Sequence, residues 1–155
     1  MNSKLRDIYG LGEPRLMAAL RERGLQPEDI DIVIDTHLHF DHCGGNTRMV
    51  DGSPAPAFPN ARYITQRGEL EHARHPSERD RASYFPENFE PMAQTGQWSL
   101  IEKDEEIAPG VQLIRAPGHN RDMMCVLLTG GGQTAMLLAD LVPTTAHLPL
   151  PWIMG

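Results

Sequence analysis

A short apolar segment that leads directly into a cluster of metal-ligating side chains is the strongest constraint on this chain. Residues 31–35, Asp-Ile-Val-Ile-Asp, have the pattern of a strand, and His37, His39, Asp41 and His42 follow directly. Alternate side chains of an extended backbone point the same way, so His37 and His39 can bind one ion. Imidazole nitrogen and carboxylate oxygen are ligands for zinc, iron and manganese. The segment predicts a strand that ends at a metal site. A polar loop of solvated histidines is the weaker alternative, because clustered histidines usually handle a metal or a proton.

Two later segments share features with known metallo-hydrolases. Residues 116–119 are Ala-Pro-Gly-His, and residues 137–140 are Leu-Leu-Ala-Asp. In their order after His-x-His-x-Asp-His, they resemble the second ligand loop and the strand with a metal-bridging aspartate of the metallo-β-lactamase superfamily. The run Thr-His-Leu-His-Phe-Asp-His-Cys-Gly-Gly-Asn is most similar to the lactonase-like and glyoxalase-II-like branches. The resemblance covers most of the chain, and its first motif is highly specific.

The resemblance implies a site for two metal ions. The implied ligands are His37, His39 and His119 for the first ion, and Asp41, His42 and Asp140 for the second. Asp140 would bridge the two ions, and Asp41 would also act in catalysis by orienting a hydroxide or moving its proton. We expect two divalent transition metals, zinc first, with iron or manganese as alternatives, because nitrogen and oxygen donors accept all three. Family members carry one more ligand histidine well after the bridging aspartate, and its absence here would leave the second site one ligand short.

The function implied by the resemblance is that of a metal-dependent hydrolase. A metal-bound hydroxide would attack an ester, lactone or thioester bond of a small-molecule substrate. One alternative is a mononuclear iron dioxygenase of the same fold that acts on persulfides and needs mainly His37, His39 and His119. Another is a non-catalytic, truncated fragment that binds metal or only self-associates. Metal analysis with a panel of thioester, lactone and persulfide substrates separates these hypotheses.

The remaining histidines have competing interpretations. His147 lies in the segment Pro-Thr-Thr-Ala-His after Asp140. It is a candidate for substrate binding or for the absent ligand, against a structural role in a loop. His72 and His75 lie among charged residues of a predicted helix, and we interpret them as solvated surface residues.

The implied fold is α/β, a metallo-β-lactamase-like αββα sandwich. It is incomplete, because the opening strands and a C-terminal part are missing, and residues 1–155 form a single, partial domain. The expected helices cover residues 13–23 and 68–75, and the expected strands cover 31–35, 62–66, 98–102, 111–115, 123–129 and 134–139. Residues 130–132, three glycines, join the last two strands as a hairpin. A Pro-rich surface loop is expected over residues 53–59, and helical turns near the mouth of the site over 77–97.

An incomplete sandwich is expected to expose a sheet edge and apolar surface. Unpaired strand edges and large apolar patches usually mark an interface. We therefore expect a homo-oligomer, or a partner that completes the fold.

Composition excludes several other classes of protein. The net charge of −7 argues against a nucleic-acid partner, since phosphate binding needs clustered Lys and Arg. No apolar run approaches the ~20 residues that span a bilayer, so no membrane partner is expected. Two cysteines are too few for a disulfide framework, and Cys43 is interpreted as a small buried thiol. Residues at the N-terminus do not have the pattern of a signal peptide, which favours a cytoplasmic protein.

Overall fold

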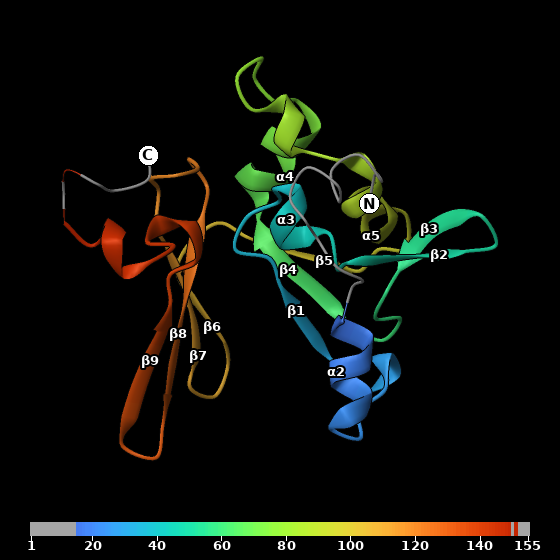
Figure 1. The fold of residues 1–155 in the computed structure, drawn as a ribbon, viewed down its shortest axis with the longest axis horizontal. Coiled ribbons are helices and arrows are strands. Elements are labelled where there is room, and N and C mark those ends of the chain that lie inside the picture. Colours follow the sequence, from blue (N-terminus) through green and yellow to red (C-terminus); the bar gives the residue numbers. More distant parts are fainter. Residues whose placement is uncertain (1–14, 150, 152–155) are drawn as a thin grey trace.

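The computed structural model describes residues 15–149 and 151 (Figure 1). Its centre is a parallel sheet with the strand order β1-β4-β5. The strands are β1 (Ile32–Ile34), β4 (Arg62–Gln66) and β5 (Trp98–Ile101). The three strands expected in these regions are confirmed, and the first and last are shorter than expected.

A second, antiparallel sheet has the strand order β6-β7-β8-β9. The strands are β6 (Glu105–Ala108), β7 (Val111–Arg115), β8 (Met124–Gly130) and β9 (Gln133–Leu137). Gly131 and Gly132 join β8 to β9, both with positive φ, as a two-residue hairpin turn requires. The last three strands were expected within two residues of these bounds, whereas β6 was not.

The Pro-rich segment corrects one expectation. Residues 53–59 were expected to be a loop, but β3 (Ser53–Pro56) pairs with β2 (Thr47–Val50) in an antiparallel hairpin. Pro54 lies opposite Met49 in this ladder. A proline lacks a backbone donor, yet it is tolerated where only one neighbouring strand must be satisfied.

The helices are short. They are α2 (Leu16–Glu22), α3 (Phe40–Cys43), α4 (Arg67–Arg74) and α5 (Glu90–Gln94). Single 3₁₀ turns cover Pro27–Asp29, Arg81–Ser83, Pro86–Asn88, Ala139–Leu141 and Thr145–His147. The expected helix at 13–23 is confirmed from Leu16 on, and residues 13 and 14 lie outside the described part. The helix expected at 68–75 is confirmed, and it begins and ends one residue earlier than expected.

Apolar side chains on the two faces of the central sheet divide the core in two. Tyr63 of β4 packs with Leu70 of α4 and Met92 of α5, whereas its neighbour Ile64 packs with Leu113 and Met124 of the second sheet. This alternation follows from the two-residue period of a strand. Figure 1 shows the resulting layers, with helices on one side of β1-β4-β5 and the second sheet on the other. The chain thus has a partial metallo-β-lactamase-like fold, with three layers of the expected sandwich among the described residues.

Strand direction determines where the ligand candidates lie. The carboxyl ends of β1, β7 and β9 lead into residues 36–42, 116–119 and 138–140, respectively. The backbone N–H of Met124, at the start of β8, donates to the carbonyl of Thr36 at 3.0 Å and joins the two sheets at this end. No helix among residues 15–149 is long and apolar enough to cross a membrane.

Candidate metal centre

The segment that follows β1 is buried and held in place by polar contacts. Asp35, Thr36, His37 and Leu38 are all buried. Asn46 Nδ2 donates to Asp35 Oδ2 at 2.8 Å, which closes the chain around α3. Burial raises the pKa of Asp35 to about 7, against the lowering effect of the hydrogen bond from Asn46. The backbone that carries the first ligand residues is therefore held in place by burial and by this hydrogen bond.

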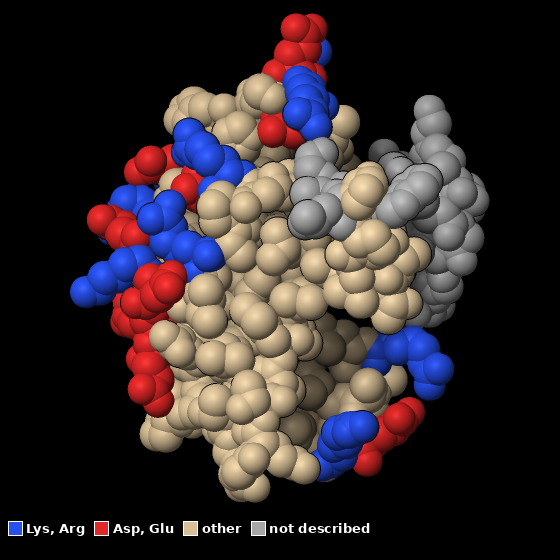
Figure 2. All heavy atoms as spheres, turned by 90° about the vertical axis from the view of Figure 1, so that its left-hand side faces the viewer, with Lys and Arg blue, Asp and Glu red and all other residues tan. Residues whose placement is uncertain are grey.

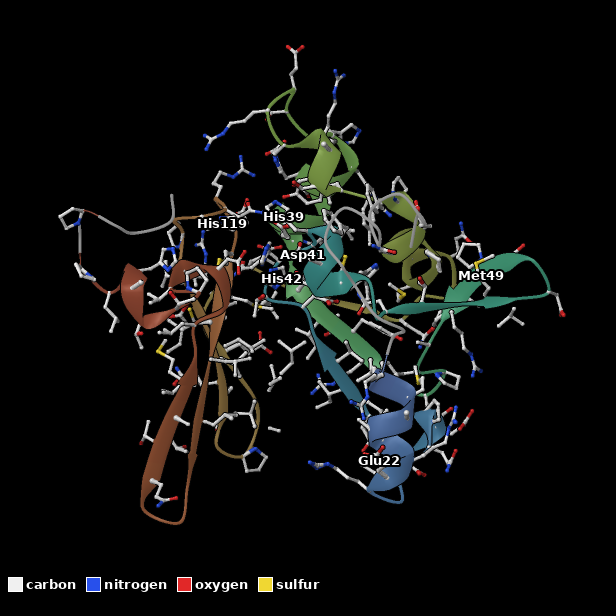
Figure 3. All side chains as sticks on the ribbon, viewed as in Figure 1. Glu22, His39, Asp41, His42, Met49 and His119 are labelled. Atoms are coloured by element: carbon white, nitrogen blue, oxygen red, sulfur yellow. The ribbon has the colours of Figure 1, made fainter. Side chains whose placement is uncertain are left out.

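Three imidazoles form the first cluster. The ligand atoms of His37, His39 and His119 all lie within 4.8 Å of one another. His119 Nε2 and His39 Nδ1 are 3.2 Å apart. Figure 3 shows His39 and His119 side by side, between α3 and the ends of the second sheet, although they are 80 positions apart in sequence.

The first cluster is suited to bind a cation because two of its histidines, His37 and His39, favour the neutral form. Burial, followed by the charge of neighbouring imidazoles, lowers the pKa of His37 to about 2. Burial and His119 also lower the pKa of His39. Neutral imidazole is the form that ligates metal. His37 Nε2 is buried and has no hydrogen-bond partner among the described residues, so it can ligate a metal in the tautomer whose ring proton is on Nδ1.

His37, His42 and Asp140 form a second cluster, again within 4.8 Å. Asp140 Oδ2 lies 3.2 Å from His42 Nε2 and 3.5 Å from His119 Nε2. One carboxylate oxygen is thus within reach of both clusters. The residue before it, Ala139, has a φ of 46°, a strained conformation for a residue with a side chain, of the kind that concentrates at functional sites.

Two other predicted site residues lie outside both clusters among the described residues. Asp41 is on α3, with a side chain that is 60% exposed, and its Oδ2 is 3.7 Å from His42 Nε2. The His147 Nδ1 atom lies 2.8 Å from Thr144 Oγ1 in a 3₁₀ turn. Their predicted roles remain predictions.

A pocket of about 580 Å³ opens beside the first cluster. His39 and His119 line it, and the other lining residues are His72, Ser77, Arg79, Asp80, Ser83, Gly118, Asn120 and Arg121. His72 was expected to be a solvated surface residue, but it lines this pocket and its Nε2 lies 2.7 Å from Asp80 Oδ2. The sequence indicated only that His72 lies on a charged helix, and no pattern in it predicted the contact with Asp80.

The buried residues Glu69, Tyr84 and Asn120 lie behind the clusters and were not expected to take part in the site. Glu69 Oε1 accepts hydrogen bonds from the other two and from the backbone of Leu38. Nothing in the sequence separates Glu69 from Glu71, the exposed acidic residue of the same helix.

The donor set fits divalent transition metals. Imidazole nitrogens in the first cluster, and imidazoles with a carboxylate in the second, are the ligands that zinc, iron and manganese accept. Fold and site together define an α/β protein with clustered histidines at the ends of its strands. The sequence model of the metallo-beta-lactamase superfamily matches residues 9–155, and the chain belongs to this superfamily.

Curated relatives include bacterial lactonases. An N-acyl homoserine lactonase of a Bacillus species is 38% identical over 116 residues, which cover 75% of this chain and 40% of the relative. The N-acyl homoserine lactonase AiiB of Agrobacterium fabrum is 32% identical over 138 residues, covering 84% of this chain and 47% of the relative. The chain therefore spans less than half the length of these relatives.

Solved structures agree with the fold. A probable metal-dependent hydrolase from Staphylococcus aureus matches with a TM-score of 0.86 at 30% identity, over 95% of this chain and 52% of that one. An N-acyl homoserine lactone hydrolase with its product N-hexanoyl-L-homoserine at the catalytic metal centre matches with a TM-score of 0.69 at 32% identity, over 86% and 47%. The expected lactonase-like resemblance is thus confirmed.

Proposed function

We propose that this chain is the metal-binding part of a hydrolase that opens lactone esters of small molecules. The observation that carries the proposal is the convergence of two donor groups on His37, at one end of the two sheets. The relatives named N-acyl homoserine lactonase support the lactone as the substrate class. Ester and thioester bonds are the neighbouring possibilities.

The proposed roles of the residues follow the clusters. His37, His39 and His119 would hold the first ion, and His42, Asp140 and Asp41 the second, with the Asp140 carboxylate within reach of both. When bound, two divalent ions, zinc in the first place, supply a water that ionises near neutral pH and polarise the substrate carbonyl. Asp41 Oδ2, which is 3.7 Å from His42 Nε2, is the proposed proton carrier, because its exposed carboxylate can exchange protons with solvent.

Substrate would enter through the pocket beside His39 and His119. Its lining contains hydroxyl, amide and charged side chains, which suit a small polar molecule. Small-molecule sites typically combine such a cavity with a few polar groups that fix orientation. His147 stays a second candidate for substrate binding.

We also propose that the chain works as an assembly with a second copy. Leu137 of β9 is 59% exposed, and Met136 beside it is 43% exposed. β9 is the edge strand of its sheet among the described residues, and exposed edges with apolar side chains favour pairing with another strand. Figure 2 faces this side of the molecule and shows few charged side chains over its centre.

A substrate panel tests the proposed reaction. The zinc-loaded chain is incubated with a homoserine lactone, a thioester and a persulfide, with hydrolysis followed by pH change and oxidation by oxygen uptake. Faster opening of the lactone supports the proposal, and His119→Ala should abolish it while the exposed His75→Ala should not. Oxygen uptake with persulfide and iron would instead support the dioxygenase alternative. Metal binding with no turnover by the assembled protein would support a non-catalytic fragment.

A further inference from the structure

Glu69 is a fully buried carboxylate that the proposed reaction does not use. It lies in the first turn of α4 with 0% of its surface exposed. Its Oε1 atom accepts three hydrogen bonds, from Leu38 N at 2.8 Å, Tyr84 Oη at 3.2 Å and Asn120 Nδ2 at 3.1 Å. Its Oε2 atom is buried and has no partner among the described residues. One oxygen thus gathers donors from three separate segments.

Two of these donors belong to the segments that carry the histidines. Leu38 stands between His37 and His39, and Asn120 directly follows His119. The distance between the two segments is therefore set through one carboxylate oxygen. Since a ligand set must match its ion to within ~0.2 Å, a change in this spacing alters metal binding.

Tyr84 completes a closed arrangement around Glu69. Asn120 Nδ2 donates to Tyr84 Oη at 2.7 Å, and Tyr84 donates in turn to Glu69. The ring of Tyr84 also meets the ring of His39 edge-on, with centroids 4.9 Å apart. Burial and the Glu69 charge raise the pKa of Tyr84, so its hydroxyl stays protonated and remains a donor.

The start of α4 approaches the second segment closely, which is an independent sign of the same packing. A Cβ atom added to Gly68 would lie 2.6 Å from Asp122 Cγ, a distance that real Cβ contacts do not show. Glycine at this position allows α4 to lie against the residues that follow His119. The helix that carries Glu69 is thereby fixed relative to both ligand segments.

We propose that Glu69 is a positioning residue of the metal centre: its Oε1 atom holds the segments of Leu38 and Asn120 at the separation that lets His37, His39 and His119 meet on one ion. The proposal rests on the proposed metal site. Groups that orient ligands from behind typically change metal affinity ~10- to 100-fold when removed.

The test compares three variants by their binding of Co²⁺ and Zn²⁺. Glu69→Gln keeps an oxygen acceptor of the same reach, Glu69→Ala removes it, and Glu71→Ala is the matched control from an exposed position of the same helix. Affinity is measured by competition with a chelator, and the Co²⁺ absorption spectrum reports the ligand geometry. We expect ~10- to 100-fold weaker binding and an altered spectrum for Glu69→Ala only.

Several outcomes overturn the proposal. Folded Glu69→Ala with the wild-type affinity and spectrum overturns it, and so does a Glu69→Gln variant as weak as Glu69→Ala, which would assign the effect to charge. If Glu69→Ala does not fold, Asn120→Ala replaces it, because this variant breaks the bond to the second segment and keeps the bond from Leu38. Unchanged Co²⁺ binding in Asn120→Ala then overturns the proposal. A wild-type chain that binds neither ion contradicts the proposed function itself.

Discussion

His37 is the residue on which the two donor clusters meet. Its side chain is fully buried, its Nδ1 lies 3.2 Å from Thr36 Oγ1, and its Nε2 has no partner within the described part of the chain. A buried polar atom without a partner costs about 1–3 kcal/mol. A metal ion bound to Nε2 would remove that cost. Without metal, the burial of this atom lowers the stability of the folded chain.

The two clusters should respond differently to loss of one ligand. We expect His119→Ala to remove the metal of the first site, because only two imidazoles would remain there. Asp140→Ala should remove mainly the second metal. Elemental analysis of metal per chain measures both, with His75→Ala as a control outside the clusters. Equal metal content in all three variants would contradict the assigned ligands.

Stability of the metal-free chain should depend on the ionisation of His37. Its pKa of about 2 in the folded state lies below the ordinary 6.5, so the stability that the neutral form supports is complete above pH 6.5 and is lost as the pH falls toward 2. Urea unfolding in chelator should show a loss of stability between pH 6.5 and 5 that is about 2 kcal/mol larger in the wild type than in His37→Asn. The same pH slope in both proteins would show that His37 is not responsible.

Ligand candidates were predictable at this scale, whereas the residues behind them were not. The spacing of His37 and His39 after a strand is a local pattern that sequence carries directly. Glu69 and Asn120 acquire their roles only because distant segments fold onto each other. Nothing local distinguishes buried Glu69 from exposed Glu71.

The elements that sequence predicts best are those with a clear two-residue period or a glycine turn. β4 and β7 match their expected bounds, and the β8–β9 hairpin turns at its glycines. β3 was missed because its prolines favour a loop, and only pairing with β2 makes it a strand. β6 was missed because its acidic residues, Glu105 and Glu106, are exposed and lack an apolar pattern.

Two glycines of the second sheet allow the cost of backbone strain to be compared with the cost of a steric clash. Gly110 and Gly132 have φ angles of 75° and 74°, but a Cβ on Gly110 would collide with the carbonyl of Thr129 while one on Gly132 meets nothing within 4 Å. Both alanine variants should lose about 1–2 kcal/mol from the left-handed conformation, and Gly110→Ala should lose more. Thermal unfolding measures this, and an equal decrease in Tm for the two variants would contradict the described β6–β7 turn.

On the scale of the whole molecule, apolar side chains of β8 and β9 are uncovered on both faces of the second sheet: Leu128 and Leu137 lie on the face of Val126, and Met136 lies on the opposite face. Leu128, Met136 and Leu137 are each more than 40% exposed, at 41%, 43% and 59%. The central sheet, in contrast, is covered by helices on one side and by β6–β9 on the other (Figure 1). The β9 edge of the second sheet, with exposed apolar side chains on both faces, is therefore available for a second copy.

Self-association should depend on β9. We expect light scattering to give a mass above that of one chain at micromolar concentration, and Leu137→Lys to lower it, because a charge at an exposed edge opposes strand pairing. Met49→Lys is the matched control, since Met49 is 68% exposed on β2 and lies far from β9 (Figure 3). A wild-type monomer with cooperative unfolding would contradict this assembly. If the assembly forms, we expect hydrolysis to be weak in the single chain and stronger in the assembled protein.

The central claim is that the two clusters bind metal, and anomalous diffraction from zinc-loaded crystals tests it most directly. We expect a strong zinc peak among His37, His39 and His119, and a weaker one beside His42 and Asp140, with the two ~3.5–4 Å apart. Zinc bound only at another place, such as the His72–Asp80 pair, or no zinc at all, would contradict the claim.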